Sequence, residues 1–248
     1  MLAAQRREGI LRAVRSGTAR VPELAAAFDV SPMTVRRDLR MLAREGKLER
    51  VYGGAISAEE DRPFAEIAVE RAEAKQRIGV AAAALVREGQ TLMLDIGTTA
   101  VQVARHLRGR SLTVITTNLA AYEELLPESG ITLILPGGTV RRDYRSLVGV
   151  VAEDSLRQLS ADVAYIGTSG VDDEGSVWDT TMAEVPIKRA MMAGADRVVL
   201  LADRQKFSMS GVVRVCGAGD IDQIVTEEEI PPTTAIAVRE AGVEVTLA

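Results

Sequence analysis

The chain has 248 residues, of which 47% are hydrophobic and only 3% aromatic, so it can bury a sizeable core of aliphatic side chains. It contains one cysteine and one histidine, which excludes an internal disulfide and the spaced Cys/His sets of a metal site. No apolar run is long enough to span a membrane, and the charged first residues lack the apolar core of a signal peptide, so a cytoplasmic protein is expected.

Charge is distributed unevenly along the chain. Residues 1–57 carry 11 Lys/Arg against 6 Asp/Glu, a net charge of +5, whereas residues 58–248 carry 19 against 29, a net charge of −10. A basic unit attached to an acidic one is typical of a polyanion-binding domain joined to a domain with another task. A solvated basic helix face would give the same numbers, so charge alone does not decide between the two.

Three short helices open the predicted fold. Apolar residues recur at helical spacing over residues 5–16, 22–28 and 32–45, and glycine follows the first and third segments. Ser31 and Pro32 are a strong start signal for the third helix, because a hydroxyl N-cap precedes proline at the first helical position.

The third helix has two distinct faces. Val35, Leu39 and Leu42 share one face and should pack on the first two helices, while polar and basic side chains take the other. Two helices joined by a tight turn, the second with a basic face, form a helix-turn-helix that enters the DNA major groove. Residues 47–52 alternate like a strand and predict a β-wing beside the groove. The side chains expected to contact DNA are Ser31, Met33, Thr34, Arg36, Arg37, Arg40, Lys47 and Arg50.

Helix triplets of this size also occur in protein-interaction modules, where arginines only maintain solubility. The serine-proline cap, the paired arginines, the wing and the charge asymmetry together favour DNA binding. The chain resembles the DeoR-type regulators in a long ordered signature: Val30-Ser31-Pro32-Met33-Thr34-Val35-Arg36-Arg37-Asp38-Leu39, then Leu42, Gly46, Leu48, Arg50 and Gly53-Gly54-Ala55. The resemblance implies a bacterial regulator, usually a repressor, of sugar and related carbon metabolism. Tyr52 departs from the pattern, which usually has histidine before the paired glycines.

The rest of the chain predicts a second, larger domain. Residues 57–63 are polar and end in proline, which predicts an exposed linker, and residues 64–86 predict one long helix. Short apolar runs then alternate with helical patterns, which indicates a largely parallel sheet covered on both faces. The predicted strands are residues 92–94, 112–115, 131–135, 163–166, 198–201 and 223–225, with an edge strand at 243–247. The expected fold is an N-terminal winged helix-turn-helix (1–57), a linker and connecting helix (58–74) and a doubly wound, mostly parallel α/β sensor domain (75–248).

Polar residues and glycines stand where five of these strands end. In a parallel sheet the ligand crevice lies beyond the carboxyl ends of the strands. The first end, Asp95-Ile96-Gly97-Thr98-Thr99, precedes a helix whose free N–H groups and two hydroxyls predict an anion-binding cradle. Glycine at a strand end is usually only part of a turn, but five polar ends in one domain favour a shared pocket. The other four ends are Thr116-Thr117-Asn118, Pro136-Gly137-Gly138, Gly167-Thr168-Ser169-Gly170, and Ala202-Asp203 with Lys206 just beyond.

This half also resembles the DeoR-type sensor domain, which is similar to ribose-5-phosphate isomerase and glucosamine-phosphate deaminase folds. The resemblance implies a phosphorylated sugar or polyol effector whose phosphate lies on Gly97-Thr98-Thr99 with help from Lys206 and whose hydroxyls bind Asp95. The chain departs from the family at Arg204-Gln205. It also departs at Ile67, a position at which the family usually has arginine. No cofactor and no metal are expected. The matching positions are Lys75, Asp95-x-Gly97-Thr98-Thr99, Thr117-Asn118, Gly137-Gly138, Gly149, Ile166-Gly167, Gly170, Asp179, Glu184, Lys188 and Asp203-x-x-Lys206-Phe207.

Likeness to isomerases raises the alternative of an isomerase-like enzyme with a DNA-binding head. Glu184, Asp179 or Asp203 could act as a general base and Lys206 or Lys188 as an electrophilic partner; otherwise these charges bind the ligand or pair with one another. The DNA-binding head favours a regulator, so no catalytic residue is assigned. Double-stranded operator DNA, bound by a homodimer or homotetramer, and the effector are the expected partners. The predicted effector-binding residues are Asp95, Gly97, Thr98, Thr99, Thr117, Asn118, Gly137, Gly138, Gly167, Thr168, Asp179, Glu184, Lys188, Asp203 and Lys206.

Overall fold

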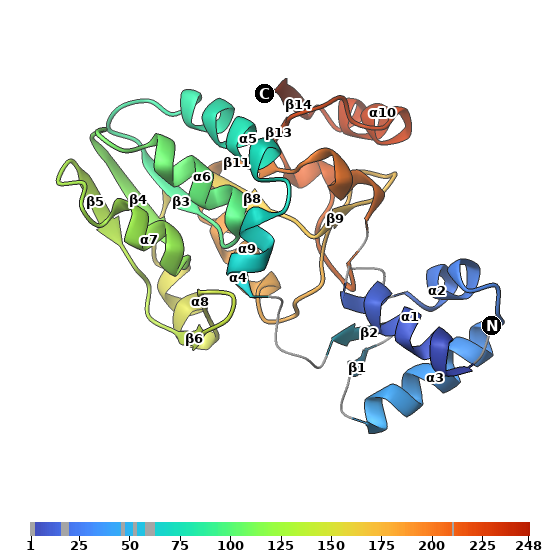
Figure 1. The fold of residues 1–248 in the computed structure, drawn as a ribbon. Helices are drawn as coiled ribbons and strands as arrows, with labels where there is room; N and C mark the ends of the chain where they lie inside the picture. Colours follow the sequence, from blue (N-terminus) through green and yellow to red (C-terminus); the bar gives the residue numbers. More distant parts are fainter. Residues whose placement is uncertain (1–2, 16–19, 46–47, 52–53, 58–62, 210) are drawn as a thin grey trace.

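The computed structural model of the chain describes residues 3–15, 20–45, 48–51, 54–57, 63–209 and 211–248 (Figure 1). Within these residues, the N-terminal head contains the helices α1 (Ala3–Arg15), α2 (Val21–Ala27) and α3 (Pro32–Arg44) and the antiparallel strands β1 (Leu48–Val51) and β2 (Gly54–Ser57). This arrangement confirms the predicted winged helix-turn-helix. The core of the head is small and aliphatic, with Ile10, Leu24, Val35, Leu39, Leu42 and Leu48 at its centre.

A buried ion pair joins α1 to α3. The Nε of Arg6 donates to Oδ2 of Asp38 at 2.7 Å, and these side chains are only 9% and 3% exposed. Asp38 lies on the buried face of α3 together with Val35 and Leu39. Because a buried carboxylate is costly without its partner, the pair fixes the rotation of α3 against α1.

Seven parallel strands form the main sheet of the second domain, in the spatial order β14-β13-β11-β8-β3-β4-β5. All six predicted strands are confirmed, and so is the edge strand. The chain order changes direction between β3 and β8, which is where a doubly wound sheet forms its ligand crevice. The strands are β3 (Thr91–Leu94), β4 (Leu112–Thr116), β5 (Ile131–Ile134), β8 (Ala161–Gly167), β11 (Ala195–Leu201), β13 (Gln223–Thr226) and β14 (Glu244–Leu247).

Helices cover both faces of this sheet. Because strand side chains alternate, Leu92 and Leu94 pack on one face with α5 (Ala72–Ala84), α6 (Thr98–His106) and α7 (Leu119–Leu125), whereas Met93 points to the other. That opposite face carries α8 (Val150–Leu156), α9 (Val185–Ala193) and α10 (Pro232–Glu240). None of the described helices is long and apolar enough to cross a membrane.

Two small sheets were not predicted from the sequence. A hairpin pairs β6 (Thr139–Arg141) with β7 (Ser146–Val148), and a second antiparallel sheet has the order β12-β10-β9. Strands of two to four residues are too short to show an alternating pattern. The second sheet comprises β9 (Gly170–Val171), β10 (Val177–Asp179) and β12 (Val213–Cys216), and short 3-10 turns lie at η1 (Arg204–Ser208) and η2 (Ala218–Asp220).

The prediction of one helix over residues 64–86 is wrong. The segment folds into α4 (Phe64–Val69) and α5, which are separated at Glu70 and Arg71. Arg71 takes φ 49°, in the left-handed region, and its side chain pairs with Glu227 and, at 3.3 Å, with Asp203. These two long-range carboxylates stabilise a backbone conformation that no local pattern announces.

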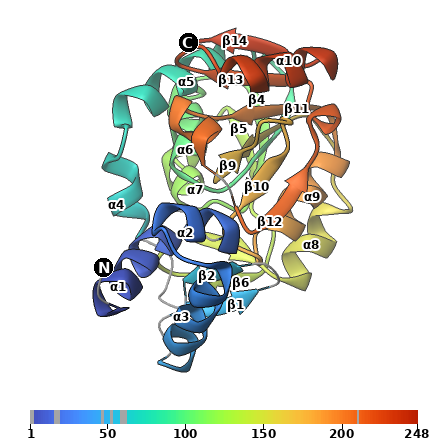
Figure 2. The same ribbon diagram turned by 90° about the vertical axis from the view of Figure 1, so that its right-hand side faces the viewer.

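The head lies beneath the second domain in the view of Figure 2. Arg20, directly before α2, places its guanidinium carbon 4.0 Å from the centre of the Trp178 ring in β10. The two domains therefore contact each other at the residue that precedes α2. They are also joined covalently by the chain between β2 and α4.

Candidate functional site

Side-chain hydrogen bonds set the beginning of α3. Ser31 has an extended backbone (φ −66°, ψ 150°), and its Oγ accepts a hydrogen bond from the Thr34 N–H at 3.2 Å. The Ser31 and Thr34 hydroxyls lie 3.0 Å apart. Thr34 is therefore part of the cap and is half-buried, while Ser31 is exposed.

The outer face of α3 carries most of the predicted DNA-binding side chains. Met33, Arg36, Arg37 and Arg40 are all exposed, and these three guanidinium groups form no ion pair with other described residues. Exposed guanidinium groups on the second helix of a helix-turn-helix suit contact with phosphates and guanine edges. Lys47 lies outside the described residues, and for Arg50 only the backbone in β1 is described.

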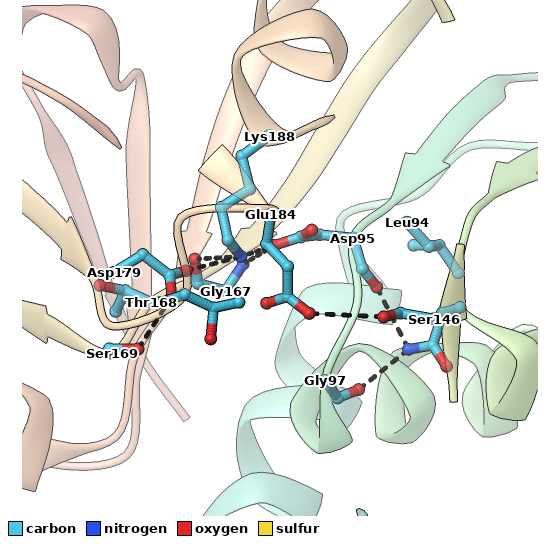
Figure 3. A network of polar contacts seen from close by, with 12 residues as sticks. Leu94, Asp95, Gly97, Ser146, Gly167, Thr168, Ser169, Asp179, Glu184 and Lys188 are labelled. Atoms are coloured by element: carbon cyan, nitrogen blue, oxygen red, sulfur yellow. Dashed lines mark hydrogen bonds and ion pairs between the residues drawn. The ribbon is translucent and has the colours of Figure 1, made fainter. Parts of the chain in front are cut away.

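Four residues from different elements form a buried polar cluster at the carboxyl ends of the strands: Asp95, Gly167, Asp179 and Lys188 (Figure 3). The Nζ of Lys188 pairs with Asp95 and lies 3.5 Å from Oδ2 of Asp179. It also donates to the Gly167 carbonyl at 3.2 Å, and the Gly167 N–H donates to Asp95 Oδ2 at 2.8 Å. Lys188 and Asp95 are 2% and 0% exposed, so water hardly screens their charges.

Two carboxylates keep Lys188 charged. Burial by itself lowers the pKa of Lys188, but Asp95 and Asp179 stabilise the ammonium and raise this pKa above its ordinary value. Burial raises the pKa of Asp95, an effect that Lys188 and the Gly167 N–H oppose. At neutral pH the polar cluster therefore presents a fixed ammonium between two carboxyl groups.

The start of α6 adjoins the polar cluster. Gly97 takes φ 101°, a conformation that favours glycine, and α6 begins at the next residue. The Asn118 amide donates to the carbonyls of Asp95 (3.3 Å) and Gly97 (3.0 Å), which holds the loop between β3 and α6 in place. The first N–H groups of a helix have no intrahelical partner, so this end of α6 can hold an anion.

Two polar atoms that follow the neighbouring strands β3 and β4, at the sheet edge where α6 begins, have no hydrogen-bond partner among the described residues. They are Oδ1 of Asp95 and Oγ1 of Thr117, and both residues are 0% exposed. A buried polar atom without a partner is costly, so such atoms mark places where a ligand or a water molecule binds. A carboxylate oxygen and a hydroxyl next to a helix N-terminus suit a molecule with hydroxyl groups at one end and an anion at the other.

The predicted effector residues are only partly brought together. Thr168 shapes the turn before β9, because its hydroxyl bonds to the carbonyls of Gly170 and Trp178 at 2.8 and 3.0 Å. The residues that lie in or next to the polar cluster or at the start of α6 are Asp95, Gly97, Thr98, Thr99, Thr117, Asn118, Gly167, Thr168, Asp179, Glu184 and Lys188.

Other predicted effector residues lie apart from the polar cluster. Asp203 caps η1 through the Gln205 N–H at 3.0 Å and pairs with Arg71. Gly137 and Gly138 pack on α8, where a Cβ on Gly138 would lie 3.0 Å from Ala152. Lys206 lies in η1, and no hydrogen bond or ion pair within the described part of the chain joins its side chain to the cluster.

Sequence reasoning missed three residues on the β6–β7 hairpin. Arg141 pairs with the buried Glu184, and the Ser146 hydroxyl donates to the same carboxylate at 3.4 Å. The hydroxyl of Tyr144 lies 3.7 Å from where a Cβ on Gly97 would be. The available signal was the cationic and aromatic run Arg141-Arg142-Asp143-Tyr144-Arg145 between two glycine turns, but only the fold brings it to the site.

The carboxylates considered as catalytic bases have cationic partners. Glu184 pairs with Arg141, Asp179 with Lys188 and Asp203 with Arg71. Among the described residues no group of three or more His, Cys, Asp or Glu side chains could hold a metal ion. The arrangement is one of charges that pair with and position each other.

Family models match the two parts of the chain separately. The DeoR-like helix-turn-helix domain matches residues 6–61, and the DeoR C terminal sensor domain matches residues 70–228. Curated relatives match over almost the whole length. A putative aga operon transcriptional repressor of Escherichia coli is 33% identical over 98% of this chain and 93% of its own. The glycerol-3-phosphate regulon repressor of Escherichia coli is 33% identical over 96% of both chains.

Solved structures are similar at a lower level. A ribose 5-phosphate isomerase A from Methanocaldococcus jannaschii has 19% identity and a TM-score of 0.40, over 54% of this chain and 53% of that one. Both of these relatives are named as repressors, which confirms the prediction of a regulator. With both domains matched and relatives of full length, the chain belongs to the DeoR family of helix-turn-helix transcriptional repressors.

Proposed function

We propose that the protein represses genes of sugar or related carbon metabolism in the cytoplasm and releases its operator when a phosphorylated sugar or polyol binds the second domain. The observation that supports this effector class most directly is the pair of buried atoms without hydrogen-bond partners among the described residues, Asp95 Oδ1 and Thr117 Oγ1, at the sheet edge where α6 begins. Oxygen atoms of this kind suit hydroxyl groups, and the helix start suits a phosphate.

In the proposed complex the phosphate lies on Gly97, Thr98 and Thr99, and the hydroxyls of the ligand bind Asp95. In addition to the N–H groups at the start of α6, the ammonium of Lys206 binds the phosphate, since η1 follows β11 at the same edge of the sheet. Lys188 keeps its charge next to Asp95 and fixes the orientation of the carboxylate, so that one of its oxygens remains available to the ligand.

The switch is a linkage between two binding events. We propose a homodimer or homotetramer in which two heads bind adjacent half-sites of the operator. The effector binds more tightly to a state in which head spacing no longer matches the half-sites. Bound effector then lowers the affinity for the operator, and bound operator lowers the affinity for the effector by the same factor. The relatives' names support carbon metabolism as the setting, as in the aga operon and glycerol-3-phosphate regulon repressors of Escherichia coli.

The test pairs variants in the two domains. Arg37→Ala and Arg36→Ala should weaken operator binding by about 1–3 kcal/mol each and reduce its salt dependence, because each removes a phosphate or base contact. Effector binding should not change. Lys206→Ala should weaken effector binding and leave operator binding unchanged, giving a repressor that binds DNA but is poorly released by the effector. Gel shifts at several salt concentrations and a thermal-shift screen of phosphorylated sugars measure both quantities.

The matched control is Arg87→Ala, which removes an exposed arginine of the second domain. It should leave DNA binding and effector binding unchanged. If Arg37→Ala bound operator as tightly as the wild type at moderate salt, α3 would not be the recognition helix. If Lys206→Ala were released normally, the phosphate would have another second ligand.

A further inference from the structure

The loop of the β6–β7 hairpin is fixed to its surroundings by main-chain hydrogen bonds. The Leu119 N–H donates to the Arg145 carbonyl at 2.9 Å, and the Leu147 N–H donates to the Thr117 carbonyl at 2.9 Å. The loop is therefore attached to the carboxyl end of β4, the strand whose continuation supplies Thr117 and Asn118 to the candidate effector site. The hairpin and the candidate effector site therefore share main-chain hydrogen bonds.

Tyr144 stands at the centre of this loop and faces the start of α6. Its hydroxyl is 3.7 Å from the position of a Cβ on Gly97, and apart from Gly97 and its two chain neighbours no other described atom lies within 4 Å of that position. The hydroxyl thus borders the space in which an anion held by α6 would lie. Burial, together with the nearby Asp179, raises the pKa of Tyr144 to about 12, so at neutral pH the hydroxyl is protonated and able to donate.

The opposite side of the loop contacts the segment that leads to the head. The ring of Tyr144 packs edge-on against Phe64, with centroids 6.4 Å apart and planes at 81°. The Phe64 N–H donates to the Asp143 carbonyl at 2.8 Å, and the guanidinium carbon of Arg145 lies 5.8 Å from the Phe64 ring centre. Phe64 is buried and is the first residue of α4, and residues 58–63 join it to the wing strand β2.

We propose that Tyr144 is an effector-binding residue whose hydroxyl donates to the anionic group at Gly97, and that its ring transmits the bound state to Phe64 and so to the chain leading into the wing. This rests on the proposed function, because it requires an anionic effector at the start of α6. Tyr144 touches the ligand, whereas Phe64 acts through Tyr144 and is a positioning residue. The hairpin that sequence reasoning overlooked is then the link between the two binding events.

The first variant removes the hydroxyl alone. Tyr144→Phe keeps the ring against Phe64, so the protein should fold and bind operator DNA as the wild type does. Its affinity for the ligand should fall about tenfold, the effect of losing a hydrogen bond to a charged group. The measurements use full-length protein, DNA selected from a random-sequence pool by the wild type, and glycerol 3-phosphate, fructose 6-phosphate and inorganic phosphate as probes. Tyr122→Phe, a hydroxyl deletion on α7, is the matched control and should change nothing.

The second variant tests transmission. Phe64→Ala should bind the same probe within roughly a factor of three of wild type, yet need about tenfold more of it to release half of the DNA, because the contact that carries the change is gone. Phe64→Tyr keeps the ring and should restore release. If Phe64→Ala does not fold, Phe64→Leu takes its place, since it keeps an apolar side chain without the ring edge.

Each outcome separates this inference from the proposed function. A wild type that binds none of the probes would contradict the proposed effector class, and the role of Tyr144 would fall with it. A wild type released by a probe, with Tyr144→Phe binding that probe equally well, would overturn the role of Tyr144 alone. Normal release in Phe64→Ala would show that the effector acts on the head by another route.

Discussion

Lys188 balances the charge of the candidate effector site. It is buried between Asp95 and Asp179, both of which are themselves buried. Because two carboxyl groups surround one ammonium, the polar cluster suits hydroxyl groups of a ligand rather than an anion. Recognition of the anionic end therefore falls to the start of α6 and to groups on the hairpin and η1.

Removing Lys188 should destabilise the fold as well as the site. Lys188→Met keeps the volume of the side chain but leaves two buried carboxylates without their cation, a loss of about 3–5 kcal/mol. Chemical denaturation of the second domain, followed by circular dichroism, measures the change. The double variant Asp95→Asn/Lys188→Met should recover part of the loss, because one of the uncompensated charges is removed as well. A loss of less than about 1 kcal/mol in the single variant would mean that the carboxylates are neutral without Lys188.

The residues of the site were predictable to different degrees. Asp95, Thr117 and Asn118 were found because they follow buried apolar strands, and parallel strands bring their carboxyl ends to one edge. Asp179, Glu184 and Lys188 carry no such local signal and entered only through family resemblance. Asp203 follows a strand as Asp95 does, yet it pairs with Arg71, since the break between α4 and α5 brings that arginine to it. An ion pair between residues this far apart in the chain cannot be recognised from the spacing of residues in the sequence.

At the scale of elements, the main strands and the recognition helix were predicted well, and the short strands were not. A strand covered on both faces is a continuous apolar run, and α3 has a capping serine and a clear apolar face, so each carries its own signal. The β6–β7 hairpin is held by contacts with β4, α4 and Glu184, none of which is local. It was therefore missed, and Tyr144 with it.

The close approach of α5 and α6 depends on Gly79. A Cβ on this residue would lie 2.5 Å from Cβ and 2.7 Å from the main-chain carbonyl carbon of Gln102 in α6. Main-chain atoms cannot rotate away, so the two helices would have to separate. This cost exceeds the gain in helix propensity that alanine brings, about 1 kcal/mol.

Gly79→Ala should therefore lower the free energy of unfolding by about 1–3 kcal/mol. It should also weaken effector binding, because a displaced α6 carries Gly97 and Thr98 with it. Thermal unfolding and the phosphate-probe titrations measure both effects. Gly219→Ala is the control, since a Cβ there meets nothing within 4 Å. A Gly79→Ala protein as stable as the wild type would show that the helices separate at little cost.

At the scale of the whole molecule, the chain from β2 to Phe64 connects the head to the second domain. The described residues add the contact between Arg20 and Trp178. The Trp178 indole N–H donates to Asp172 at 2.6 Å, and one Arg20 nitrogen is buried without a hydrogen-bond partner among the described residues. Because Asp179 follows Trp178 in β10, its side chain points to the opposite face, toward Lys188. Two adjacent residues of β10 thus contact different parts of the molecule: Trp178 contacts the head and Asp179 contacts the polar cluster.

Trp178 is the single tryptophan of the chain, so its fluorescence reports this contact directly. Arg20→Ala should shift the emission to longer wavelength and increase quenching by acrylamide, because the indole ring loses the side chain that covers it. The emission and quenching of Arg20→Lys should lie between those of the wild type and Arg20→Ala, since an ammonium above the ring retains part of a cation–π attraction of about 0.5–2 kcal/mol.

Adding the effector probe to the wild type should move the Trp178 emission to longer wavelength as well if release separates the head from β10. Arg20→Ala should then respond little to the probe, and its operator should be released less completely. Equal spectra for the wild type and Arg20→Ala would contradict the contact, whereas a spectral change without any effect on release would limit its role to holding the domains together.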